Sequence, residues 1–283
     1  MERRPFGKTE HRLSIIGFGG IVVMGKPQEE ANRLVREAID RGVNYFDVAP
    51  SYADAEDRLG PALVGLRDGV FLACKTAQRK KAEAAAELRA SLKKLRTDRF
   101  DLYQLHGLPS TAEVETCFGP GGAMEAVLEA KQAGLIRYVG FSAHSAEGAL
   151  LALEKYPFDS VLFPFNYTTW YQASFGPQVL EAAKQRGATR LVLKAMARRP
   201  WPEGAERKYR NCWYEPIDDP KEAALALRWS LSLDVTAAIP PGDPELFRLA
   251  MDIADRFTPI SAGERATVEK MAMANAPLFR MAG

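Results

Sequence analysis

Cysteine is scarce in this sequence, and its scarcity excludes two kinds of site. It occurs three times in 283 residues, as Cys74, Cys117 and Cys212, with no Cys-x-x-Cys spacing. An odd number at such spacings argues against a disulfide framework and against a zinc site. We therefore expect a reducing compartment and no bound metal.

Long apolar runs are also missing. The longest one covers residues 13–25, contains four glycines and is too short to span a bilayer. The charged N-terminal segment MERRPFGKTEH lacks the apolar centre of a signal peptide. These absences predict a soluble, cytoplasmic protein without a membrane partner.

An excess of one charge sign is missing as well. The 38 basic and 36 acidic residues are interspersed and leave a net charge of +2, which does not favour a nucleic-acid partner. The densest basic group lies between Arg198 and Arg210, where it could serve one anionic small molecule. The hydrophobic content of 47% is typical of a globular protein with a sizeable core.

What the sequence does contain is a regular alternation of strand patterns and amphipathic helix patterns. Strands are predicted to begin near residues 15, 44, 70, 100, 137, 160, 189 and 235. Helices are predicted from Glu56 and over Gln28 to Arg41, Lys80 to Leu95, Gly122 to Ala133, Ala146 to Lys155, Pro177 to Gln185, Pro220 to Leu231 and Pro244 to Arg256. Eight such units predict a (β/α)8 TIM barrel that forms a single domain over residues 1–283.

Three further segments lie outside this alternation. Residues 1–14 should form an N-terminal β-hairpin at one end of the barrel, and residues 262–274 an extra C-terminal helix. The irregular stretch 195–219 is rich in proline, arginine and aromatic residues, and we interpret it as a functional loop that sets substrate specificity. Six aromatic residues are candidates for an apolar substrate pocket or for ordinary packing: Phe18, Trp170, Tyr171, Trp201, Trp213 and Tyr214.

Barrel enzymes carry their chemistry where the strands end, so polar residues at strand ends are the candidate catalytic groups. Asp47 ends the second strand and Tyr52 follows in its loop, Lys75 ends the third strand, and His106 ends the fourth. Each alone has an ordinary explanation as a helix cap, a packing residue, a solvated cation or a neutral histidine. Their arrival on consecutive strands predicts one shared site.

The four groups together suit proton transfer to a carbonyl oxygen. A phenol has a reference pKa of about 10, and a neighbouring ammonium should lower it and favour the phenolate. Asp47 would hold Lys75 charged and oriented, while His106 would orient or polarise the carbonyl. We interpret the set as machinery that gives a proton to a carbonyl oxygen as a hydride reaches its carbon.

These residues resemble the catalytic tetrad of the aldo-keto reductases. FDVAPSYADAEDRLG resembles the family's Asp and Tyr segment, FLACKT and DLYQLHG its Lys and His segments, and GLIRYVGFS its entry into strand five. The resemblance runs from about Phe6 to Arg256. It implies a (β/α)8 barrel that reduces aldehydes or ketones with NADP(H), or alternatively NAD(H), and in which Tyr52 is the general acid.

The cofactor side of the resemblance rests on other residues. Ser142 stands where the family contacts the nicotinamide carboxamide, with His144 in place of asparagine, and Lys194 stands in place of the strand-seven aromatic residue. The family's I-P-x-G turn contains Pro240 and Gly242, and its amides suit phosphate. The basic residues to test for phosphate contact are Arg248, Arg198 and Arg199. As ordinary alternatives, Ser142 caps a helix, Lys194 pairs with a carboxylate and the arginines are solvated.

Two other functions fit the sequence. One is a nicotinamide-binding regulatory or scaffold protein of the same fold with little turnover. The other is a barrel lyase with Lys75 as the Schiff-base amine, although Asp47 and Tyr52 suit a charged lysine better than a nucleophilic one.

Overall fold

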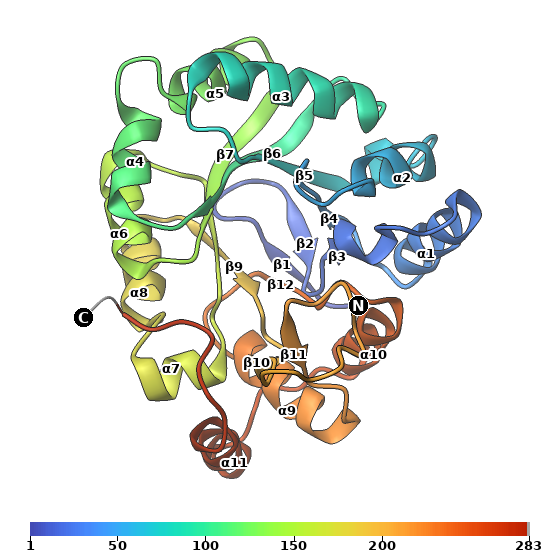
Figure 1. Cartoon of the computed structure of the whole chain (residues 1–283). Coiled ribbons are helices and arrows are strands. Elements are labelled where there is room, and N and C mark those ends of the chain that lie inside the picture. Colours follow the sequence, from blue (N-terminus) through green and yellow to red (C-terminus); the bar gives the residue numbers. More distant parts are fainter. Residues whose placement is uncertain (282–283) are drawn as a thin grey trace.

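The computed structural model describes residues 1–281 and has a barrel of eight parallel β-strands at its centre (Figure 1). The barrel strands are β3 (Phe18–Gly19), β4 (Tyr45–Asp47), β5 (Phe71–Thr76), β6 (Phe100–Leu108), β7 (Ile136–Ala143), β8 (Ser160–Phe163), β9 (Thr189–Leu193) and β12 (Ala237–Ile239). Neighbouring strands are hydrogen-bonded in this order, and a parallel bridge between Ile16 and Ala238 joins the two edges. The predicted TIM barrel is confirmed.

Helices surround the barrel. The α-helices are α1 (Gln28–Asp40), α2 (Ala55–Ala62), α3 (Lys81–Lys94), α4 (Thr111–Phe118), α5 (Ala123–Gln132), α6 (Ala146–Lys155), α7 (Tyr167–Ala173), α8 (Pro177–Gln185), α9 (Pro220–Leu231), α10 (Pro244–Asp255) and α11 (Ala262–Met273). Two 3₁₀ turns, η1 (Gly20–Val23) and η2 (Arg67–Gly69), complete the set. Every predicted helix is present within one or two residues, including the extra C-terminal helix α11, whereas α4 and α7 were not predicted.

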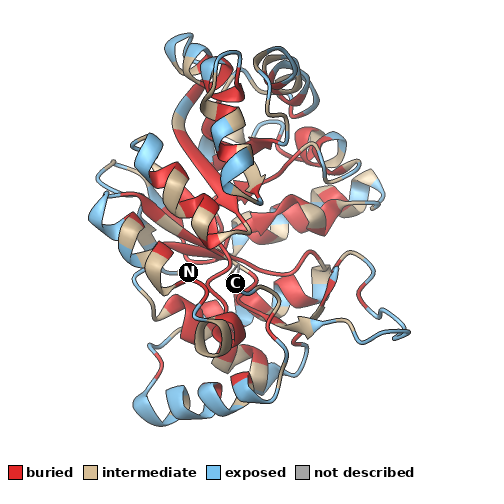
Figure 2. Ribbon diagram, turned by 60° about the vertical axis from the view of Figure 1, so that its left-hand side comes forward, coloured by how far each residue is buried: buried red, intermediate tan, exposed pale blue. Residues whose placement is uncertain are grey.

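Buried residues lie along the barrel strands and on the inner faces of the helices (Figure 2). The larger apolar cluster fills the layer between strands and helices, as in α1, where Leu34 and Val35 face inward. A smaller cluster fills the barrel interior. The alternation of the two faces along each strand produces this division, because successive side chains point to opposite sides.

The predicted N-terminal hairpin is present and covers one end of the barrel. It pairs β1 (Arg3–Pro5) with β2 (Arg12–Ser14) in antiparallel register. Phe6 and Leu13 are fully buried and belong to the interior cluster together with the barrel residues Tyr45 and Phe71. The hairpin therefore closes the N-terminal end of the barrel with apolar side chains.

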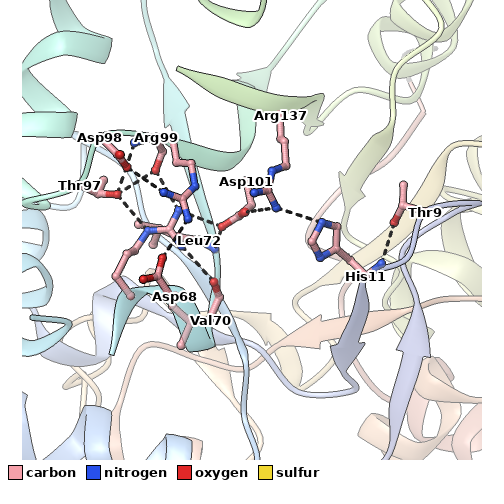
Figure 3. A network of polar contacts seen from close by, with 11 residues as sticks. Thr9, His11, Asp68, Val70, Leu72, Thr97, Asp98, Arg99, Asp101 and Arg137 are labelled. Carbon is pink, nitrogen blue, oxygen red and sulfur yellow. Dashed lines mark hydrogen bonds and ion pairs between the residues drawn. The ribbon is translucent and has the colours of Figure 1, made fainter. Parts of the chain in front are cut away.

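A polar network around Asp101 ties the strands together at this end (Figure 3). The Asp101 carboxylate accepts a hydrogen bond from the Leu72 amide at 2.9 Å and pairs with Arg67 at 2.9 Å and Arg137 at 3.4 Å. Arg137 in turn lies 3.3 Å from the imidazole of His11 on the hairpin side. Because Asp101 is 4% exposed, this carboxylate is a buried junction between neighbouring strands and the hairpin.

The functional loop predicted over 195–219 contains a second hairpin. It pairs β10 (Ala197–Pro200) with β11 (Tyr214–Pro216) in antiparallel fashion. Residues between these strands pack on the start of α10, where Tyr209 and Cys212 contact Leu246. The loop is therefore an ordered wall at the C-terminal end of the barrel.

Candidate active site at the C-terminal ends of the strands

The four predicted catalytic residues lie together at the C-terminal end of the barrel. Asp47 is the last residue of β4, Lys75 lies near the end of β5, and His106 follows on β6. Tyr52 lies in the loop after β4 and reaches back toward the same point. Parallel strands deliver their ends to one edge, which explains why residues nearly 60 positions apart meet here.

The Asp47 carboxylate is the centre of the buried part of the site. One oxygen forms a short ion pair with the Lys75 ammonium. The other accepts hydrogen bonds from the Tyr45 hydroxyl at 3.1 Å and the Gln104 amide at 3.0 Å. Three donors therefore fix the orientation of the carboxylate, and in this orientation it holds the Lys75 ammonium in place.

Tyr45 and Gln104 were not singled out from the sequence, although a signal for both was present. Tyr45 precedes Asp47 by two residues, and Gln104 precedes His106 by two. Side chains two apart on a strand point to the same face, so both had to face the barrel interior beside the predicted site.

Lys75 is charged in this environment. Burial alone lowers the pKa of its ammonium, but the negative charge of Asp47, the nearby Tyr52 hydroxyl and the hydrogen bond that Lys75 donates to Asp47 outweigh burial and raise it. The Lys75 nitrogen lies 5.4 Å from the centre of the Tyr52 ring. The structure thus pairs Asp47 with Lys75 beside the Tyr52 ring, which is the arrangement that the sequence predicts.

The expected direction for the Tyr52 pKa is wrong. Burial is the largest influence and raises the pKa of the phenol, and the nearby Lys75 charge lowers it by less. Tyr52 is therefore a neutral phenol at physiological pH, held beside an ammonium that stabilises the phenolate once the proton leaves. That is the state required of a proton donor.

His106 faces Tyr52 as a neutral imidazole. The two rings meet edge to face with centres 5.7 Å apart. Burial first, and then the charge of Lys75, lower the pKa of His106 to about 2. Its Nδ1 lies 3.3 Å from the hydroxyl oxygen of Ser51, which orients the ring.

The predicted cofactor residues Ser142 and His144 lie at the end of β7, next to the catalytic group. The Ser142 hydroxyl accepts a hydrogen bond from the Gly107 amide at 2.7 Å, so it does not cap the following helix, which Ser145 does. The Nε2 of His144 is buried without a hydrogen-bond partner among residues 1–281. Burial and the charge of Lys194 lower the pKa of His144 to about 3, so the ring is neutral.

The predicted phosphate contacts Arg198 and Arg248 are both occupied by carboxylates. Arg198 pairs with Glu222 and lies 3.6 Å from Glu215, and Arg248 makes two hydrogen bonds of 2.8 Å to Glu37. The nearby Arg199 likewise pairs with Glu215 at 2.7 Å. All three arginines are therefore paired with carboxylates in this structure, although Arg248 is also exposed to solvent.

The turn that contains Pro240 and Gly242 lines the cleft beside η1. A Cβ atom at Gly242 would clash with Ile21, so only glycine lets the two segments approach. The following helix α10 begins with a cap of its own, because the Asp243 carboxylate accepts from the amides of Glu245 at 2.9 Å and Leu246 at 3.3 Å. Two backbone amides that would suit phosphate therefore already donate to the Asp243 carboxylate.

Lys194 lies in the same cleft as Asp47 and Tyr52, in a space of about 550 Å³ that is partly open to solvent. The predicted alternative, a pair with a carboxylate, is not found within residues 1–281. The rings of Trp213 and Tyr214 lie 5.4 Å and 5.8 Å from its ammonium. The loop thus supplies aromatic residues beside the end of β9.

Phe279 near the C-terminus was not identified from the sequence. Its ring stacks on His144 with centres 5.1 Å apart and on Phe175 at 5.4 Å, and it meets Trp213 edge to face at 6.0 Å. A single phenylalanine after the last helix carries no pattern that points to a site. Only the folded chain brings the tail to the rim of the cleft.

The sequence matches a family model over most of these elements. The model described as the aldo/keto reductase family matches residues 15–198, which include the four predicted catalytic residues and seven of the eight barrel strands. The chain belongs to the aldo/keto reductase family.

Curated relatives match this aldo/keto reductase over part of their length. Aldo-keto reductase YhdN of Bacillus subtilis is 29% identical over 217 residues, which cover 70% of this chain and 63% of that protein. The uncharacterized oxidoreductase YqkF of the same organism is 32% identical over 156 residues, which cover 50% of this chain and 49% of that protein. The matched regions span less than two thirds of these relatives.

Solved aldo/keto reductase structures match the whole barrel. Aldo-keto reductase AKR11C1 from Bacillus halodurans, in its holo form, superimposes with a TM-score of 0.75 over 98% of each chain at 27% identity. The thermostable aldo-keto reductase Tm1743 gives a TM-score of 0.70 at 20% identity, a likeness of fold alone. Among residues 1–281, no helix has both the length and the apolar character that crossing a bilayer requires.

Proposed function

We propose that this protein reduces aldehydes or ketones to alcohols with a nicotinamide cofactor, with Tyr52 as the general acid. The observation that carries the proposal is the cluster of the buried Asp47–Lys75 pair with the half-buried Tyr52 and His106 at one end of the barrel. Membership of the aldo/keto reductase family supports it. When bound, the nicotinamide supplies the hydride that reaches the carbonyl carbon.

The chain's own residues handle the proton and the orientation of the carbonyl. Neutral His106 offers a ring N–H that orients the carbonyl oxygen toward Tyr52. Tyr52 then donates its proton to that oxygen. The Lys75 ammonium, which Asp47 keeps charged, stabilises the phenolate that remains.

The residues of the cleft fit the nicotinamide end of the cofactor. The Nε2 of His144, which has no hydrogen-bond partner among residues 1–281, and Ser142 would contact the carboxamide, and the turn with Pro240 and Gly242, which lines the cleft, would let the cofactor approach the backbone closely. For the phosphate end, Arg198 and Arg248 remain the proposed partners. Each would have to exchange its present carboxylate for a phosphate, and we propose NADP(H) as the cofactor on the family resemblance, with NAD(H) as the alternative.

A regulatory or scaffold function is the second candidate. It is favoured by the occupied state of the phosphate side, where Asp243 caps α10 and both arginines are paired. The lyase alternative is disfavoured, because an amine that Asp47 holds as an ammonium is a poor nucleophile.

One experiment separates these functions. NADPH and NADH are titrated by fluorescence, and a panel of aldehydes and ketones is then tested with the wild type, Tyr52→Phe and the control Tyr156→Phe. We expect nucleotide binding by all three proteins and a fall in turnover of about 100-fold or more in Tyr52→Phe only, because the proton donor is lost.

The other outcomes have distinct meanings. Turnover by Tyr52→Phe at the wild-type rate would remove Tyr52 as the acid. Binding without turnover of any carbonyl compound would favour the regulatory function, and no nucleotide binding would refute both. Covalent trapping of Lys75 by borohydride with a carbonyl compound would restore the lyase alternative.

A further inference from the structure

Lys194 occupies an unusual backbone position. It follows directly after β9 with φ of +61°, in the left-handed region that residues other than glycine rarely adopt. The buried Asn166 side chain holds this conformation, because its amide donates to the carbonyls of Lys194 and Ala197 at 2.9 Å each. The fold therefore maintains strain at this residue and fixes the direction of its side chain.

The Lys194 ammonium is a buried charge that has no counterion in the described part of the chain. Lys194 is 8% exposed, and within residues 1–281 its nitrogen forms no hydrogen bond or ion pair. Its neighbours are the rings of Trp213 and Tyr214, and the charge that acts on it most strongly is that of another cation, Lys75. An uncompensated buried ammonium is costly to a folded protein, whereas Lys75 in the same cleft has Asp47.

Lys194 lies in the same cleft as the proposed proton donor. Lys194 lines the cleft together with Tyr52, and its charge contributes to lowering the pKa of His106 and of His144. An anion bound to Lys194 would thus have the rest of its molecule beside the proton donor. A single ammonium matches the single charge of a carboxylate, whereas a phosphate normally takes several cationic and amide donors.

We propose that Lys194 binds the carboxylate of the substrate, so that the enzyme reduces oxo-carboxylic acids, which are aldehydes or ketones that also carry a carboxylate. This inference rests on the proposed reductase function. The reacting atoms are the same as above: the carbonyl carbon gains the hydride, the carbonyl oxygen gains the proton of Tyr52, and the carboxylate is unchanged. The buried ring of Tyr214 and the half-exposed ring of Trp213 lie beside this ion pair and partly shield it from water, which strengthens it.

A matched pair of substrates tests the assignment. The ratio of kcat/KM for 4-oxobutanoate to kcat/KM for butanal, which has the same carbon chain without the charge, is measured for the wild type and Lys194→Met. Lys270→Met on the exposed face of α11 removes an equal charge far from the cleft and serves as control. We expect the wild type to favour 4-oxobutanoate, and the ratio to fall about 10- to 100-fold in Lys194→Met alone.

Calorimetric binding of 4-hydroxybutanoate, with butanol for comparison, makes the result independent of turnover. Binding that depends on Lys194 without reduction of any carbonyl compound would support the carboxylate site and refute the reductase function. Reduction with an unchanged substrate ratio would refute the carboxylate site and leave the reductase function intact. If Lys194→Met instead weakens NADPH binding about tenfold at an unchanged ratio, Lys194 is a cofactor contact and the inference is overturned.

Discussion

Replacement of Lys194 by methionine should make the ligand-free protein more stable. Methionine keeps a similar length and volume but removes a buried charge that has no ion-pair partner among residues 1–281. Burial first, and then repulsion from Lys75, lower the pKa of Lys194 from 10.5 to about 8. Since one pKa unit corresponds to about 1.4 kcal/mol, the charge costs the folded state about 3 kcal/mol.

The sign of the pH dependence follows from the order of the two pKa values. Below pH 8 the folded and unfolded chains both keep the proton, so the full cost applies. Between about pH 8 and 10.5 the folded protein releases the proton while the unfolded chain keeps it, and the cost disappears. The neighbouring thiol of Cys212 has a pKa of about 12, and burial raises the pKa of Tyr214 well above its usual value, so neither titrates in this window.

Urea denaturation of both proteins from pH 7 to 10.5, in buffers without carboxylates, measures the effect. We expect Lys194→Met to be more stable by about 3 kcal/mol at pH 7 and the difference to shrink toward zero at pH 10.5. Groups elsewhere titrate equally in both proteins and cancel. A difference that does not vary with pH, or a wild type that is the more stable protein at pH 7, would refute the reasoning.

Two further predictions concern the supports of the barrel and of the cleft. Asp101→Asn should lower the free energy of unfolding by about 3 kcal/mol, because it removes the buried carboxylate that Arg67 and Arg137 share. The control Asp98→Asn, at an exposed ion pair, should change it by less than about 1 kcal/mol. Urea denaturation measures both. Asn166→Ala should lower the free energy of unfolding by about 3 kcal/mol, because it removes a helix cap together with the two hydrogen bonds that position Lys194. Loss of those two bonds should also reduce the preference for 4-oxobutanoate over butanal. Equal substrate ratios in Asn166→Ala and the wild type would show that the backbone at Lys194 does not depend on this side chain.

The fold was predictable because its signals are local and repeated. Helices over 146–155, 177–185 and 220–231 begin and end where the sequence pattern places them. Helix α4 was missed although Ser110 and Glu113 have capping-box spacing, and the Ser110 hydroxyl does accept from the Glu113 amide. Helix α7 is short, and its start depends on Asn166, which also bonds to the next strand's end.

The residues of the candidate site likewise differ in how far local sequence signals predict them. The clustering of the four candidate catalytic residues could be predicted because consecutive strands deliver them to one edge. The ion pairs of the predicted phosphate contacts could not be predicted, because they join distant segments, as Arg248 with Glu37 and Arg198 with Glu222 do. The direction of the Tyr52 pKa was wrong for a related reason, since the extent of burial is a property of the whole fold.

Strand β6 carries the buried Asp101 near one end and His106 near the other. Five residue steps along the strand separate the two by about 17 Å, a distance at which mutational effects usually add. Substitutions around the Asp101 junction should therefore change the free energy of unfolding without changing substrate preference. In directed evolution, gains at the N-terminal end could offset losses that new specificities impose at the cleft, so the two ends of this barrel can be optimised separately.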